Sequence, residues 1–450
     1  MNFSVRVLAV IFVSSFAASV GAQSTEVPPR HLTLDEAVQL ALNHNHDVRI
    51  AGLEVQEEQR AKEVARSDYF PHVTNDSRIF TVTQTQFVQF PEGSFGTVAG
   101  SPIPAHPITI NQGGKTFVTS GTMLSEPLTQ LLTKIKPAND AAQADLNASR
   151  ADAKETENEV ALKVRQIYYQ VLITQLQQDA AQAKIRADED VESERVQQVK
   201  YGSALDEQLI KGRADTLEAK QDLLTTELQI SDLTMQLNDA MGLPVTTKLD
   251  LDTSVPPVQD TCERQDCVKI ALASHPEIVA ARAEVKKASA GVHLAKAGYF
   301  PDISAFARYS YASDVPFLAR NFGTFGAEFT WDLFDGGRRR AALRESDDKL
   351  AQAQENLARV TDDVELRVET ALNQLDRTRE MVQVSQQVLS LRTESNRVTA
   401  QQLSKGEALR SQADATLAQQ FQARTLLLQS QLDYAQAHDE LLQAMGLTPQ

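Results

Sequence analysis

The chain has 450 residues, a formal net charge of −16 and two cysteines. An acidic balance of this size argues against a nucleic-acid partner, which would need a basic patch. Mean hydropathy is negative and charged residues recur throughout the chain after its N-terminal segment, so no later window predicts a membrane-spanning helix of about 20 apolar residues.

The N-terminal segment is typical of a secretory signal. Arg6 supplies a positive charge, residues 7–20 form an apolar run, and Val20-Gly21-Ala22 is a small-residue cleavage site. We therefore expect residues 1–22 to be a signal peptide and the mature chain to begin at Gln23. The alternative is an uncleaved anchor, which the short apolar run disfavours. No cysteine follows the cleavage site, so we expect no lipid anchor there.

The sequence then repeats itself. Residues 36–42 (EAVQLAL) return as residues 266–272 (DCVKIAL), at an offset of 230 residues, and similar Met-Gly-Leu sequences close each copy at Met241 and Met445. A fixed internal repeat indicates two copies of one structural unit.

Each copy is predicted to open with two helices. Thr33 followed by Glu36 forms a capping-box pattern at the first helix start. Pro276 suits the first position of a helix in the second copy. The second helix of each copy should stop at a Tyr-Phe-Pro sequence, residues 69–71 and 299–301.

After each of these prolines the apolar period changes to two, which predicts strands. In the second copy one strand starts near Ile303, and Phe325, Phe329 and Trp331 lie on the apolar face of the other. The first copy is expected to have one strand over residues 73–90, a Gly/Pro-rich loop over 91–114 and a second strand leading to Leu128.

The remainder of each copy is predicted to be a long helical hairpin. Apolar residues recur at heptad spacing, as in Leu343, Leu350 and Leu357, which is typical of coiled coils. Gly202 and Gly406 should each produce a tight reversal, because glycine adopts positive φ cheaply. The helix expected over residues 138–201 would span about 95 Å, so the protein must be elongated.

The strands raise a question of closure. An apolar face alternating with a polar one is the signature of outer-membrane barrels, in which Phe325, Phe329 and Trp331 would face lipid. Four strands cannot close a barrel, and open edges are not tolerated in lipid, so identical chains would have to share one. The alternative is a soluble β-sandwich cap.

Cys262 and Cys267 lie in one short segment between the copies. An exported chain meets an oxidising compartment, which favours a disulfide over two free thiols. A metal site is disfavoured, because no second cysteine or histidine pair accompanies them.

These features together resemble the TolC-type outer-membrane efflux and secretion channels, the outer membrane factors, over about residues 32–447. The resemblance rests on the repeated Ala-Leu-x-x openings at Ala41 and Ala271, both Tyr-Phe-Pro sequences, residues 331–338 (WDLFDGGR) and the two glycine turns.

The resemblance implies an α+β membrane protein. Three chains would each give four strands to a 12-stranded β-barrel, continued by a long periplasmic α-helical coiled-coil barrel. The expected divisions are 1–22 (signal peptide), 23–71 and 266–301 (first helices of each repeat), 72–128 and 302–335 (barrel strands and outer loops), 129–243 and 336–447 (long hairpins) and 244–265 (linker).

The resemblance also implies partners and site residues. The partners would be two further copies of the chain, a periplasmic adaptor (membrane fusion) protein, an inner-membrane transporter of the RND or ABC type, and outer-membrane lipid. An apolar exposed tip is what a helical partner would seek; the alternative is that the tip residues serve only the turns. The adaptor-docking candidates are Gly202, Ala204, Leu205, Gly406, Ala408 and Leu409.

At the tunnel entrance the chain departs from members that carry acidic rings. The corresponding positions hold Gln208 and Gln412, whereas Asp206 and Asp414 lie nearby but offset in helical phase. A cation-selective ring is therefore not expected, and the hypothesis is a polar constriction around Gln208 and Gln412, with Asp206 and Asp414 also at the tunnel entrance.

Enzyme activity and cofactors are not expected. Residues 113–116 (GGKT) imitate the end of a phosphate-binding loop, but Thr109 stands where that motif needs glycine. His44 and His46 are two residues apart, so they face apart on a helix. The predicted function is a passive outer-membrane exit duct for small molecules in a tripartite efflux pump. The alternatives are a type I protein secretion component and a non-channel periplasmic coiled-coil protein.

Overall fold

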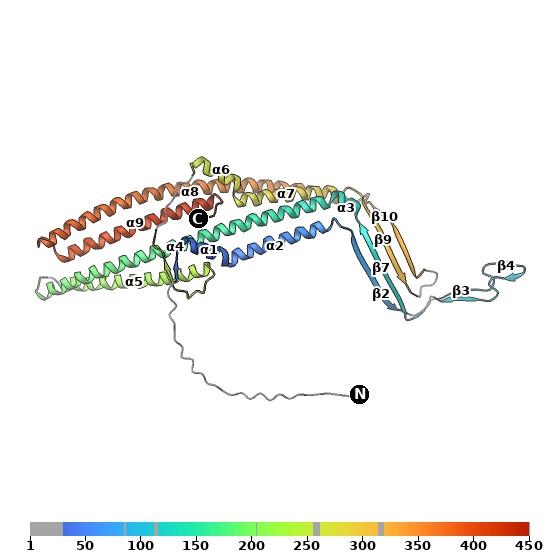
Figure 1. The fold of residues 1–450 in the computed structure, drawn as a ribbon, viewed down its shortest axis with the longest axis horizontal. Helices are drawn as coiled ribbons and strands as arrows, with labels where there is room; N and C mark the ends of the chain where they lie inside the picture. Colours follow the sequence, from blue (N-terminus) through green and yellow to red (C-terminus); the bar gives the residue numbers. More distant parts are fainter. Residues whose placement is uncertain are drawn as a thin grey trace, which may run out of the picture.

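The structure, a computed structural model, describes residues 30–84, 87–111, 116–203, 205–254, 262–313 and 319–449. The expected signal peptide lies outside these ranges. The molecule is elongated, with a sheet at one end and the tips of two helical hairpins at the other (Figure 1). Each sequence copy contributes two helices before its strands, two strands of the main sheet and one long hairpin, and the first copy adds a short helix before its hairpin.

The short helices begin where the local sequence signals predicted. The Thr33 hydroxyl accepts a hydrogen bond from the Glu36 backbone N–H at 3.3 Å, and the Glu36 carboxylate accepts one from the Thr33 N–H at 3.1 Å. The capping box is therefore confirmed, and so is Pro276 at the first helical position. These helices are α1 (Leu34–His44), α2 (His46–Ser67), α6 (Arg264–Ser274) and α7 (Pro276–Ala297).

The heptad segments form long helices, as predicted. Helix α4 has 66 residues and spans about 100 Å. It starts at Ile135, before the expected residue 138, because Pro137 falls in the first turn, where a missing N–H breaks no helical bond. None of the helices in the described ranges is long and apolar enough to cross a membrane. The bounds are α3 (Leu128–Thr133), α4 (Ile135–Lys200), α5 (Asp206–Ala240), α8 (Arg338–Ser404) and α9 (Arg410–Ala444).

The two glycine turns are confirmed. Gly202 and Gly406 have φ of +72° and +75°, and a Cβ at either would meet nothing within 4 Å. Glycine is therefore needed for backbone conformation and not for space. The next residue closes each turn: the Ser203 N–H donates to the Gln198 carbonyl at 2.8 Å, and the Glu407 N–H donates to the Gln402 carbonyl at 2.9 Å.

The long helices pack in the order α5–α4–α9–α8, so the two hairpins meet through α4 and α9. Helix α2 packs on α4, and α7 lies between α4 and α8 (Figure 1). Helices α5 and α8 are therefore the two edges of this layer.

The main sheet is antiparallel with the order β10-β9-β7-β2. The two copies meet where β7 pairs with β9, and β2 and β10 form the edges. Its strands are β2 (His72–Thr81), β7 (Thr116–Glu126), β9 (Asp302–Ala312) and β10 (Asn321–Thr330).

The single strand expected over residues 73–90 is wrong. Strand β2 ends at Thr81, and β3 begins a separate ladder that projects beyond the sheet (Figure 1). The alternation continues through both segments, but the partner changes from β7 to β6, which a one-strand pattern does not reveal. The added strands are β3 (Phe87–Phe90), β4 (Thr97–Val98), β5 (Ser101–Pro102) and β6 (Ile108–Asn111), with β3 paired to β6 and β4 to β5.

A core of buried side chains joins α1, α4, α5 and α9 where the hairpins meet. A short parallel pair, β1 (Arg30–Leu32) with β8 (Leu249–Leu251), closes over it. The Tyr168 hydroxyl donates to the Leu32 and Asp252 carbonyls at 3.1 and 2.9 Å, which fixes this pair to α4.

One buried ion pair crosses between the hairpins within this core. Arg165 on α4 donates to Asp439 on α9 at 2.6 Å, and the Tyr169 hydroxyl donates to the same carboxylate oxygen at 2.9 Å. The Arg165 and Asp439 side chains are only 4% and 2% exposed. Because both side chains are buried, water could not solvate one charge fully if the other were removed.

We predict that Asp439→Ala lowers the free energy of unfolding by about 3–5 kcal/mol, because it removes the buried partner of Arg165 and leaves the guanidinium with only the exposed carboxylate of Asp35, 3.6 Å away. Asp363→Ala is the matched control. It removes an exposed Arg359–Asp363 pair of 2.6 Å and should cost about 0.2–1 kcal/mol. Urea unfolding of the detergent-solubilised protein, followed by helical circular dichroism, measures both; equal losses would contradict the prediction.

Candidate functional site

The main sheet presents two chemically different faces. Phe325 and Phe329 are 89% and 62% exposed and lie opposite Ala307 and Ile303 on one face. Their neighbours Glu328 and, across the register, Arg308 lie on the other face. Trp331 is half exposed just beyond the end of β10. The arrangement has an apolar surface on one side and charge on the other.

The polar face also carries an ion pair on β2. Arg78 contacts Asp76 at 2.7 Å, and Asp76 lies opposite Gly121 of β7. A Cβ on Gly121 would come within 2.8 Å of the Arg308 guanidinium. The Arg308 side chain therefore occupies the space above Gly121, where any larger residue would clash with it.

The hairpin tips lie together at the end of the molecule opposite the sheet (Figure 1). Leu205 and Leu409, which precede α5 and α9, are 67% and 57% exposed. Ala408 is half-buried, and Ala204 lies outside the described residues. The tip leucines are therefore surface residues and do not pack the hairpins.

The four residues expected at the tunnel entrance are not brought together within one chain. Asp206 and Gln208 are exposed in the first turn of α5. The Gln412 side chain accepts a hydrogen bond from the Leu409 N–H at 3.2 Å, so it caps α9. Asp414 lies instead in the groove between α4 and α9.

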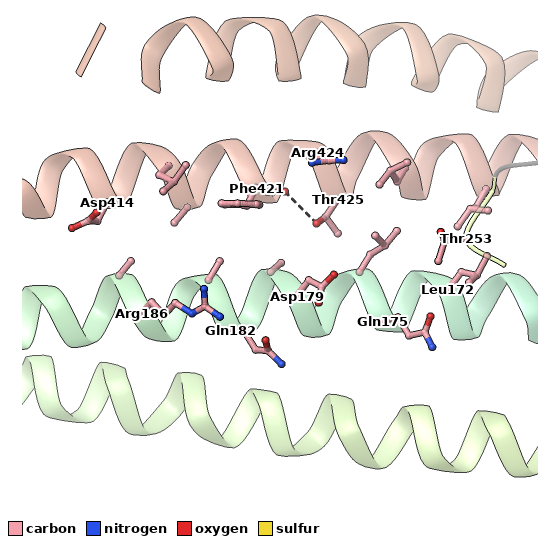
Figure 2. Close-up of a pocket in the computed structure, with 18 of the residues that line it drawn as sticks. Leu172, Gln175, Asp179, Gln182, Arg186, Thr253, Asp414, Phe421, Arg424 and Thr425 are labelled. Carbon is pink, nitrogen blue, oxygen red and sulfur yellow. Dashed lines mark hydrogen bonds between the residues drawn. The ribbon is translucent and has the colours of Figure 1, made fainter. Parts of the chain in front are cut away.

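This groove, of about 790 Å³, separates the two hairpins below the buried core. Figure 2 shows Asp179 and Arg186 of α4 facing Phe421 and Thr425 of α9 across it. Leucines and alanines supply much of the rest of its walls, together with Gln175, Gln182 and Arg424, and Thr253 lies at one end. The groove is thus an apolar channel bordered by charges of both signs.

Asp414 is the groove residue whose ionised form is disfavoured by its surroundings. Burial raises the pKa of this carboxyl, and the charge of Asp190 on α4 raises it further; Arg410, at 3.7 Å, acts in the opposite direction. Two acids therefore face each other where α4 and α9 approach the tips. The nearby Ser411 N–H donates to the Glu194 carboxylate at 3.0 Å, so a third acid of α4 holds the start of α9.

Several of these residues were not expected from the sequence. The Asp190–Asp414 and Arg165–Asp439 contacts join positions more than 200 residues apart, and no local pattern marks them. The internal repeat offers one signal: where the two copies hold different polar residues at equivalent positions, as at Asn45 and His275, a contact specific to one copy is indicated.

Cys262 and Cys267 form a disulfide at the start of α6. Cys267 is fully buried among residues that join α6, α8 and α9, including Met445. The bond therefore fixes the end of the linker against the second hairpin.

Comparison with known proteins agrees with this geometry. Residues 267–447 match the family model of the outer membrane efflux proteins. The pyoverdine export outer membrane protein OpmQ of Pseudomonas putida is 24% identical over 69% of this chain, and the match spans 63% of that protein, just under two thirds.

Solved channel structures share the fold over nearly the whole chain. The CmeC outer membrane channel of Campylobacter jejuni superimposes with a TM-score of 0.75 at 14% identity, covering 97% of this chain and 94% of that one. The open-state MtrE outer membrane channel of Neisseria gonorrhoeae gives 0.71 at 16% identity, covering 93% and 89%. The resemblance to the TolC-type outer-membrane channel family is therefore confirmed.

We predict that Asp414→Asn stabilises the protein at neutral pH, because it removes a carboxylate whose ionised form is disfavoured in the fold. A raised folded pKa means that the wild-type chain regains stability as pH falls toward the carboxyl's ordinary value. The advantage of the variant should therefore shrink between neutral pH and about pH 4. Thermal unfolding across this range tests it; an advantage independent of pH would contradict it.

Proposed function

We propose that three copies of this chain form a passive exit duct through the outer membrane, which conducts small molecules out of the periplasm as part of a tripartite efflux pump. The observation that supports this most directly is that one chain ends in matching open edges, in the sheet and in the helical layer.

The internal repeat makes the two helical edges, α5 and α8, complementary to each other. The repeat relates α4 to α8 and α5 to α9, and within the chain α4 packs on α9. The equivalent contact would place α8 of one chain on α5 of the next. Leu217, Leu224 and Leu228 on α5 are each more than 60% exposed at helical spacing, which leaves a face without a partner among the described residues.

The sheet edges follow the same rule. Within the chain β7 of the first copy pairs with β9 of the second. The equivalent pairing would join β10 of one chain to β2 of the next and leave no strand edge in lipid. Closure by three chains comes from the family resemblance, and gives a 12-stranded barrel with Phe325, Phe329 and Trp331 toward lipid and Arg308 and Glu328 toward the lumen.

The remaining parts take their roles from this assembly. The long hairpins would build a periplasmic tunnel, and the segment over residues 87–111 would project on the outer side. The charged and polar groups at the tips would line the tunnel entrance. Energy would come from an inner-membrane transporter of the RND or ABC type through a periplasmic adaptor. OpmQ is named for pyoverdine export, which supports a small molecule over a protein as the cargo.

We expect the detergent-solubilised protein to be a trimer by native mass spectrometry and to pass current in planar lipid bilayers. Leu224→Glu should lower the trimer fraction, because it places a charge in the proposed α5–α8 contact. Thr225→Glu adds the same charge one position along the helix, out of phase with the leucine row, and should leave the trimer intact. A soluble monomer without conductance would contradict the proposal.

The hairpin tips are proposed as the adaptor-docking surface, because Leu205 and Leu409 are exposed apolar residues fixed beside rigid glycine turns. Replacing both leucines with serine should reduce crosslinking to the adaptor at least tenfold. Unfolding temperature and bilayer conductance should not change, because these side chains make no core contacts. An unchanged crosslinking yield would leave the leucines as turn residues only.

A further inference from the structure

A buried histidine lies where α4, α7, α8 and α9 come together, away from the groove and the tips. His275 is fully buried and caps α7, with Nδ1 accepting a hydrogen bond from the Glu277 N–H at 3.3 Å. Its Nε2 atom has no hydrogen-bond partner among the described residues. A buried polar nitrogen without a partner is costly and requires an explanation.

Two carboxylates converge on this ring. One ligand atom each from His275, Glu155 of α4 and Glu277 of α7 lie within 4.8 Å of one another. Glu155 Oε1 accepts from Gln443 at 2.9 Å, but its Oε2 is buried and unpartnered. Glu277 Oε2 accepts from Arg367 at 2.7 Å. A nitrogen and a carboxylate oxygen without partners thus lie beside a second carboxylate.

The surroundings are short of positive charge. Glu277 and Glu159 act on Glu155 as neighbouring negative charges, and Arg367, which donates to Glu277, supplies the opposing positive charge. Three ionised carboxylates and one guanidinium would leave two negative charges. The neutral imidazole is the form of histidine that binds a metal.

The first copy shows that capping alone does not explain the histidine. Asn45 holds the equivalent position: its Oδ1 accepts from the Asp47 N–H at 2.8 Å, and its Nδ2 donates to the Ala240 carbonyl at 3.0 Å. Asparagine thus satisfies both of its polar groups, whereas His275 satisfies one of two. Gly446 packs closely against the histidine: a Cβ at Gly446 would lie 2.8 Å from the His275 Cα. The histidine is therefore tightly enclosed at this point.

We propose that His275, Glu155 and Glu277 form a binding site for one divalent transition-metal cation of the zinc type. Imidazole with carboxylates suits zinc, whereas calcium and magnesium prefer oxygen ligands alone. Coordination through Nε2 moves the ring proton to Nδ1 and gives up the long 3.3 Å capping bond. The two glutamates, both only partly buried, close on the ion, which links α4 to α7.

The test uses the full-length, tag-free protein in detergent. After treatment with a chelator it is dialysed against zinc chloride at neutral pH, and bound zinc is measured by mass spectrometry. We expect about one zinc per chain in the wild type. His275→Asn introduces the capping residue that the first copy has at this position. This variant and Glu155→Gln should each weaken zinc binding by ~10–100-fold or more, since losing even a group that only supports a ligand costs that much. His293→Asn, which removes an exposed histidine on α7, should retain the zinc.

The proposal is overturned if the wild type holds no more zinc than His275→Asn, or if His293→Asn loses zinc equally. Should His275→Asn fail to fold, X-ray absorption of the zinc-loaded wild type decides. One imidazole nitrogen with carboxylate oxygens at about 2.0–2.2 Å supports the site, and oxygen ligands alone refute it. Neither measurement depends on whether the protein conducts.

Discussion

The structure of one chain is constrained by its open edges: the sheet and the helical layer each end in a surface that this chain does not cover by itself. The sheet ends at β2 and β10, and the helical layer ends at α5 and α8, with apolar residues exposed along the helical edges. Unpaired strand edges and exposed leucine rows are unstable arrangements for an isolated molecule. By the internal repeat, each edge is a copy of a surface that is already paired inside the chain, and in the proposed trimer each edge would be covered by a neighbouring chain.

The junction between the two copies shows how such a contact is stabilised. Helices α4 and α9 meet through a buried aromatic and aliphatic core, and Arg165 with Asp439 sets their register. Toward the tips the same pair of helices separates around a groove in which Asp190 and Asp414 oppose each other. The same helix pair is thus closely packed in its middle, and near the tips it carries opposed acids beside the hydrogen bond from Ser411 to Glu194.

The two copies differ where geometry constrains them least. The segment from β3 to β6 has no counterpart of its kind between β9 and β10 among the described residues, and it projects beyond the sheet. Within the helices that both copies share, the copies differ by substitution, as with Asn45 and His275, because an insertion would shift the heptads of the hairpins. Divergence in the helices therefore changes chemistry without changing shape.

The sequence by itself determined the features that depend on neighbouring residues: the Thr33 capping box, the positive-φ turns at Gly202 and Gly406, the heptad helices and the alternating strands. The duplication further showed that two equivalent units exist. Tertiary structure alone decided the contacts between distant segments. The partner of residues 87–90, the role of Gln412 as a cap, and the opposition of Asp190 to Asp414 follow from how α4, α9 and the strands pack. Periodicity tells which face of an element is apolar but not which element covers it, because that choice is made by contacts hundreds of residues apart.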